Sequence, residues 1–159
     1  MNKNDFFNKM NNPNIYMHVT EDLNHNGHFV PRIPLSKLIS EDNKTPRVCV
    51  AENLKGCLLG ADISKNTLIK VFFVDIEKLN LTNHIVKWRE LFSNNLVLDS
   101  VVTKEAWILK EFKIRKEDTV IISIDNLKVE YDFLFDDSII PCLKLNNDDF
   151  TILKKTTYE

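Results

Sequence analysis

Three short segments of the chain carry the side chains whose chemistry is most informative. Residues 16–20 read Tyr-Met-His-Val-Thr, residues 47–51 read Arg-Val-Cys-Val-Ala, and residues 102–108 carry Glu105 two positions before Trp107. A carboxylate can stabilise positive charge that develops during a reaction, and a guanidinium is a planar donor suited to phosphate groups. An indole can stack on a flat heterocycle. The order of the three segments is more informative than any one of them.

The elements that must position these side chains begin with a strand, predicted over Asn14–Thr20 because apolar and polar residues alternate there. Successive side chains of a strand point to opposite faces of a sheet. The alternation therefore predicts two sets: Tyr16, His18 and Thr20 on one face, and Ile15, Met17 and Val19 on the other.

Further apolar runs of strand length follow along the chain. Strands are predicted at Arg47–Ala51, Leu68–Ile76, Val101–Phe112, Asp118–Leu127, Lys128–Phe135, Ile139–Leu145 and Phe150–Leu153. Helical spacing occurs in residues 1–13 (a short helix or a disordered tail), 35–39 (one turn), 52–61 and 79–95. We therefore expect one compact α+β domain over residues 1–159, with a mixed or mainly antiparallel sheet and two or three short helices. Residues 21–46 form a long polar connection, and such loops often carry binding groups.

Composition narrows the class of protein. The 159 residues are 43% hydrophobic and 28% charged, with a net charge of −2. Acidic and basic residues are interspersed, which argues against strong non-specific binding to DNA. The apolar runs are shorter than the ~20 residues that cross a bilayer, and no secretory leader pattern is found. We expect a cytoplasmic protein that does not bind membranes.

Several common sites are excluded by the residues available. The three glycines, Gly27, Gly56 and Gly60, build neither a GxGxxG nor a GxxxxGK[ST] motif, which excludes Rossmann and P-loop sites. His25 and His28 share one loop, but their spacing is not diagnostic of a metal, and no metal site is predicted.

The cysteines are predicted to be structural. Cys49, Cys57 and Cys142 are an odd number without CxxC spacing. Cysteines of this kind are usually small buried apolar residues rather than ligands or nucleophiles.

The order and separation of the three segments resemble those of small ADP-ribosyltransferase-like proteins, a group that includes tRNA 2′-phosphotransferases and bacterial toxins. The resemblance runs through residues 14–110 as an ordered pattern. In that group a strand with an aromatic-His-x-Thr pattern opens the NAD pocket. A second short strand forms the pocket wall, and a third begins with an acidic residue that acts on the ribose. The resemblance implies NAD as cofactor and transfer of ADP-ribose to an unknown acceptor, either protein or nucleic acid.

The resemblance also implies roles for individual residues. The cofactor would contact His18, Thr20, Arg32, Arg47 and Trp107, and Glu105 would be catalytic. His18 would contact the ribose next to adenine, Arg32 or Arg47 the pyrophosphate, and Trp107 a base or the nicotinamide ring. Cleavage of the nicotinamide–ribose bond develops positive charge on the sugar, much as in glycoside hydrolysis, and a carboxylate can stabilise that charge.

Other interpretations stay open. The chain, rich in Asn, Lys and Ile as proteins of AT-rich bacterial or phage genomes are, would equally suit a phage or mobile-element protein of the same fold. Such a protein would bind a nucleotide or a host protein without turnover, for instance against host defence. A third interpretation is an interaction domain that binds another protein. At the residue level, His18 would then be satisfied by a backbone group, Glu105 would face solvent, and Trp107 would fill the core.

Overall fold

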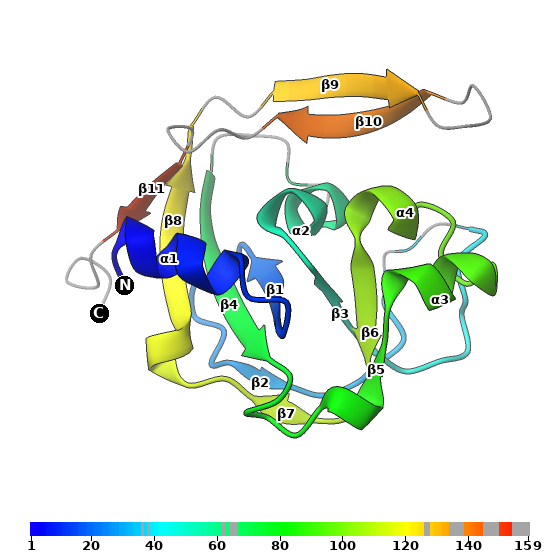
Figure 1. The fold of residues 1–159 in the computed structure, drawn as a ribbon, viewed down its shortest axis with the longest axis horizontal. Coiled ribbons are helices and arrows are strands. Elements are labelled where there is room, and N and C mark those ends of the chain that lie inside the picture. The colour runs from blue at the N-terminus through cyan, green and yellow to red at the C-terminus, as the bar shows by residue number, and fades with distance from the viewer. Residues whose placement is uncertain are drawn as a thin grey trace.

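The computed structural model describes residues 1–35, 37, 39–61, 63, 67–125, 128–133, 139–144 and 150–153, and it has an α+β architecture (Figure 1). Seven strands form one sheet in the order β11-β8-β4-β1-β3-β6-β5, and every neighbouring pair is antiparallel. The strands are β1 (Ile15–Thr20), β3 (Val48–Ala51), β4 (Thr67–Asp75), β5 (Ile85–Val86), β6 (Glu105–Ile108), β8 (Thr119–Ile124) and β11 (Phe150–Leu153). The predicted α+β class with a mainly antiparallel sheet is confirmed.

Two smaller strand pairs flank this sheet. β2 (His28–Phe29) pairs with β7 (Phe112–Lys113), and β9 (Lys128–Phe133) pairs with β10 (Ile139–Lys144). Figure 1 shows the β9–β10 hairpin beyond the end of the main sheet and the β2–β7 pair near its other end. β2 lies within the long 21–46 connection, which also reaches back to the sheet through a bridge between Arg32 and Arg47.

The described residues contain four α-helices, α1 (Lys3–Met10), α2 (Leu54–Gly60), α3 (Trp88–Ser93) and α4 (Ser100–Thr103), and two 3₁₀ turns, η1 (Thr82–His84) and η2 (Lys116–Asp118). Residues 1–13 thus contain a helix rather than a disordered tail. Asn2 and Asp5 form a capping box that satisfies free amides at the start of α1. Asn53 caps α2 by accepting a hydrogen bond from the Gly56 amide.

The sheet has an apolar core on each face, as the alternation in β1 predicts. Ile15, Met17 and Val19 pack with α1 and α2 on one face. Tyr16 belongs to a second cluster on the other face, together with Phe29 of β2 and residues next to β7. The strand therefore separates two cores, and a polar side chain on it must find a partner at a gap or an edge.

Two predicted elements are wrong in part. The strand expected over Val101–Phe112 begins only at Glu105, because Ser100–Thr103 turn into α4. Ser100 and Thr103 are buried there and bond to nearby carbonyls, and Lys104 ends the helix with φ of 53°. This tertiary burial overrides the strand preference of the two valines between them. The number of helices is correspondingly four rather than two or three.

The long helix expected over 79–95 is also shorter than predicted. Its first half forms η1 and β5, and only Trp88–Ser93 are α-helical. β5 pairs with β6, so some of the apolar side chains spaced like those of a helix belong to an edge strand.

Some predictions fall on residues that the structure does not describe. The turn considered at 35–39 includes residues 36 and 38, which lie outside the described residues. The same holds for parts of the predicted strands at 118–127, 128–135 and 139–145 and for the side chain of Cys142. No helix in the described part of the chain is long and apolar enough to cross a membrane.

Candidate functional site

A cavity of about 490 Å³ opens between the centre of the sheet, α2, α4 and the loop that precedes β3. This volume falls within the range of pockets that hold small-molecule ligands, roughly 300–1,000 Å³. The polar and charged residues that line it are His18, Lys37, Glu41, Asp99, Thr103 and Glu105, together with Cys49 and Cys57.

The cavity exists because two adjacent strands separate. β1 and β3 share one register pair, Met17 with Ala51, whereas β1 pairs with β4 over its full length. Beyond Met17 the strand β1 follows β4, and β3 follows β6 instead. Their divergence leaves backbone groups of β3 without a strand partner and opens space beside them.

His18 fills part of this gap. Its Nδ1 lies 2.8 Å from the carbonyl oxygen of Cys49, and its ring meets the edge of Phe29. Burial lowers the pKa of His18, and the charge of nearby Arg32 acts in the same direction. A neutral imidazole that donates from Nδ1 to the carbonyl satisfies both observations. The sequence allows for a His18 whose ring is satisfied by a backbone group, and the Cys49 carbonyl is such a partner. His18 also lines the cavity.

The sheet register places His18 and Glu105 on opposite faces. His18 pairs with Phe72 across β4, whereas Glu105 pairs with Ala51, which in turn pairs with Met17. Directly opposed residues share a face, and neighbours along a strand do not. Both residues are nevertheless among those that line the cavity.

Glu105 is an acidic group of the cavity that is held by two side-chain donors. Its Oε1 accepts a 2.8 Å hydrogen bond from Nε1 of Trp107, and the Cys49 thiol also bonds to the carboxyl. Burial raises the pKa of Glu105, with the charges of Glu41 and Asp99 adding to the effect. The alternative prediction, that Glu105 faces solvent, is not met, because the carboxyl is half-buried and accepts two side-chain hydrogen bonds.

Asp99 is a second carboxyl whose pKa burial raises, and the charge of Glu41 contributes to that rise. The Thr103 hydroxyl links the two acidic positions. It donates to the Asp99 carbonyl and accepts from the Glu105 amide, each at 3.3 Å. Burial and the charge of Glu41 thus act on both carboxyls in the direction of the neutral form, whereas the Trp107 and Cys49 donors favour the ionised form of Glu105.

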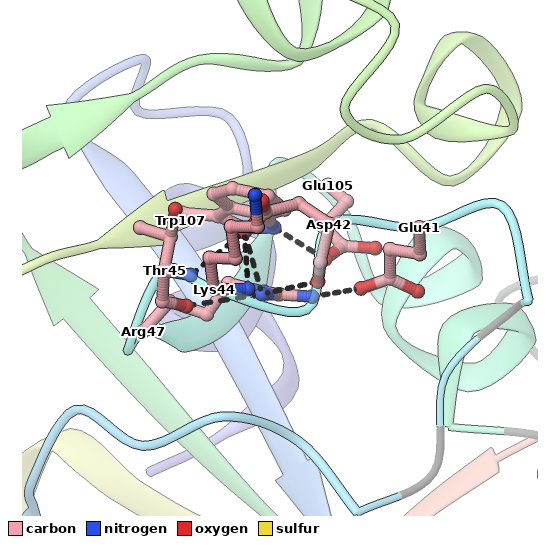
Figure 2. A network of polar contacts seen from close by, with 7 residues as sticks. All are labelled: Glu41, Asp42, Lys44, Thr45, Arg47, Glu105 and Trp107. Atoms are coloured by element: carbon pink, nitrogen blue, oxygen red, sulfur yellow. Dashed lines mark hydrogen bonds and ion pairs between the residues drawn. The ribbon is translucent and has the colours of Figure 1, made fainter.

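Arg47 and Trp107 are not among the residues that line the cavity, and Figure 2 shows their side chains close to those of Glu41 and Glu105. Arg47 is 2% exposed and Trp107 is 1% exposed. The guanidinium of Arg47 donates to the carbonyls of Asp42 and Thr45 at 3.0 Å each, forms an ion pair with Glu41, and stacks 3.9 Å from the Trp107 ring. This burial speaks against the predicted contacts of Arg47 with a pyrophosphate and of Trp107 with a ligand ring, because neither side chain has free surface to offer.

The remaining predicted residues, Arg32 and Thr20, are not among those that line the cavity. Arg32 is exposed, and its charge is felt by His18. Thr20 is half-buried at the end of β1, where its hydroxyl accepts from the Asp22 amide at 3.1 Å. The cationic side chain that does line the cavity is Lys37, in the loop before β3.

Residues missed by the sequence prediction are Lys37, Glu41, Asp99 and Thr103. A weak signal was present in Gly56, since a Cβ there would come within 1.8 Å of the Thr103 carbonyl oxygen. A glycine in mid-helix often marks such a close approach of another backbone. That contact brings α4, with Asp99 and Thr103, against α2 at the cavity edge.

The cysteines that the structure describes are structural, as predicted. The Cys57 thiol donates to the Met17 carbonyl at 2.9 Å, and burial raises its pKa to about 12. Burial and the neighbouring Glu105 also raise the pKa of Cys49. Neither residue is set up as a thiolate nucleophile. Among the described residues, no group of three or more His, Cys, Asp and Glu side chains is arranged to hold a metal ion.

Comparisons with protein families, with curated proteins and with solved structures find no match to this chain.

Proposed function

We propose that the cavity binds NAD and that the protein transfers ADP-ribose from it to an acceptor, with Glu105 as the catalytic carboxylate. One observation carries this proposal: His18 and Glu105, from separate strands, line one open cavity of ligand size. The order of the motifs along the chain supports it independently, because it resembles that of ADP-ribosyltransferase-like proteins. His18 contacts the adenine-side ribose, and Glu105 contacts the ribose next to nicotinamide.

In the proposed reaction the bond between nicotinamide and the ribose carbon breaks, and its electron pair leaves with neutral nicotinamide. The ribosyl group then carries positive charge until the acceptor attacks and loses a proton. A carboxylate beside the ribose stabilises that charge, and its effect is strong where water is excluded. Glu105 suits this task because Trp107 and Cys49 hold it in a half-buried wall.

The ionised form of Glu105 is the one that stabilises the sugar cation. Because burial raises its pKa, the carboxyl ionises at a higher pH than an ordinary glutamate does. The rate of NAD cleavage is therefore expected to rise with pH through the raised pKa and then to level off.

The pyrophosphate of NAD needs cationic partners at the open side of the cavity. Arg47 is committed to Glu41 and to two loop carbonyls. The cationic groups left for this role are Lys37, which lines the cavity, and exposed Arg32. In the proposal they replace Arg47 as the phosphate contacts.

The first test follows nicotinamide release from NAD by ¹H NMR, with wild-type protein, Glu105→Gln and the control Glu52→Gln. Glutamine keeps an oxygen that can accept from Trp107, so the fold is retained while the charge is lost. We expect a loss of roughly 10²–10³-fold in Glu105→Gln. Glu52 follows β3 directly but is not among the residues that line the cavity, and its variant is expected to match wild type.

The same samples separate the rival functions. Binding without turnover predicts thermal stabilisation by NAD without product, and a ligand at 100 Kd adds about 2.7 kcal/mol to the free energy of unfolding. If the protein is only an interaction domain, NAD is expected neither to stabilise it nor to be converted to nicotinamide. Equal rates for wild type and Glu105→Gln would contradict the catalytic role of Glu105.

A further inference from the structure

We infer that Trp107 is a positioning residue for Glu105, held in place by the Arg47 guanidinium stacked on its ring and by the loop that Arg47 anchors. This inference rests on the proposed function, because it deepens the role given to Glu105. It assigns to Trp107 and Arg47 a purpose different from ligand contact: they fix the orientation of the carboxyl that acts on the sugar.

The geometry of the hydrogen bond carries the first step. Nε1 of Trp107 donates to Oε1 of Glu105 at 2.8 Å, within the range of a well-formed N–H···O hydrogen bond. The two residues belong to the same strand, β6, and are two positions apart, so both project from one face of the sheet. An indole has a single donor, and this bond uses it. One oxygen of Glu105 is thereby held in a fixed direction.

The indole is itself immobile. Trp107 is 1% exposed and packs with Leu91 and Val97 in a small core under α3. The Arg47 guanidinium lies 3.9 Å from the ring centroid, close enough for a cation–π interaction. A rigid donor loses little entropy when it orients a side chain, so the carboxyl is pre-organised before a ligand arrives.

The loop before β3 is tied to the same cluster. Arg47 bonds to the carbonyls of Asp42 and Thr45 and pairs with Glu41 (Figure 2). The Asp42 amide donates to the Leu96 carbonyl. Glu41 also lines the cavity. Arg47 therefore connects the cavity loop to the indole that holds the catalytic carboxyl.

Four groups act on Glu105 from the elements around it. Trp107 on its own strand and the Cys49 thiol on β3 stabilise the ionised form by hydrogen bonding. Glu41 in the loop and Asp99 before α4 oppose ionisation by charge repulsion. Removal of the indole donor therefore leaves the opposing groups in place and makes ionisation of Glu105 harder.

The test measures the pKa of Glu105 directly, by ¹³C NMR of its carboxyl, in wild type and in Trp107→Phe. Phenylalanine keeps an aromatic ring for Arg47 and removes the N–H donor. We expect the pKa of Glu105 to rise, the pH profile of nicotinamide release to move upward with it, and kcat to fall by about tenfold with KM for NAD unchanged. The matched control is Trp88→Phe, because Trp88 carries cationic neighbours, Lys104 and Arg89, but does not bond to Glu105.

A second measurement on wild-type protein keeps the test decisive if Trp107→Phe does not fold. The Nε1–H resonance of Trp107 is expected to shift with pH in step with the ionisation of Glu105, and to lose that shift in Glu105→Gln. The inference would be overturned if the Nε1–H chemical shift of Trp107 did not change as Glu105 titrates. It would also be overturned if the pKa of Glu105 were unchanged in Trp107→Phe. If the two groups titrate together but wild type releases no nicotinamide, the positioning bond stands and the proposed catalysis fails.

Discussion

Glu105 lies where a carboxylate is costly for the fold. Burial and the charges of Glu41 and Asp99 raise its pKa, so the folded protein holds a proton on Glu105 at a pH where the unfolded chain has released it. Groups of this kind are common at active sites, where function favours an environment that stability does not. A carboxyl kept for structure by an ion pair would show the opposite shift.

The pH dependence of stability follows from the sign of this shift. Because the folded-state pKa of Glu105 is raised, the folded protein binds more protons than the unfolded chain between the ordinary value of 4.5 and the raised one. Its contribution to the free energy of unfolding is therefore full below the ordinary value and lost as pH rises through the window. In urea denaturation, Glu105→Gln is expected to gain stability relative to wild type as pH increases. A difference between the two proteins that does not change with pH would contradict this assignment.

At the residue scale, the sequence indicates which residues belong to a site better than it indicates which side chains are exposed to a ligand. The resemblance to ADP-ribosyltransferase-like proteins implies that His18 and Glu105 serve one site, and both residues line the cavity. The same reasoning assigned Arg47 and Trp107 to ligand contacts, yet both are buried. Whether an arginine faces solvent or anchors a loop depends on Glu41 and on carbonyls that the fold brings to it, and spacing in one strand does not reveal them.

At the scale of elements, the strands were predictable where alternation or length was clear, as in β1, β4 and β8. Short elements were not, because their conformation is set by neighbours. α4 forms where Ser100 and Thr103 become buried beside α2. The cavity depends on this contact, since Asp99 and Thr103 reach it only when α4 approaches α2.

Two glycines in α2 test the importance of that contact. A methyl group at Gly56 would come within 1.8 Å of the Thr103 carbonyl oxygen, whereas at Gly60 it would meet nothing within 4 Å. Gly56→Ala is expected to destabilise the protein, by roughly 1–3 kcal/mol as typical of overpacking, and to weaken ligand binding by displacing α4. Gly60→Ala, in the same helix, is expected to be neutral or to stabilise by up to about 1 kcal/mol. Thermal or chemical denaturation of both variants provides the comparison, and equal effects would show that the α2–α4 contact is not tight.

At the scale of the whole molecule, the site is a consequence of a sheet that divides. β1 stays with β4, and β3 stays with β6, so that a single register pair joins the two halves. The predicted α+β class could be obtained from the pattern of apolar runs. The separation of β1 from β3 could not be predicted, because it depends on which strands pair. Pairing between distant segments produces no periodic pattern in a single sequence.

We propose that one ligand contacts both His18 and Glu105, although the register places them on opposite faces. A crystal structure of Glu105→Gln with NAD tests it most directly, since the variant is expected to bind NAD without cleaving it. We expect the nicotinamide-side ribose within hydrogen-bond distance of residue 105 and the adenine-side ribose beside His18, with Lys37 or Arg32 near the pyrophosphate. NAD bound away from these residues, or no NAD bound at saturating concentration, would contradict it.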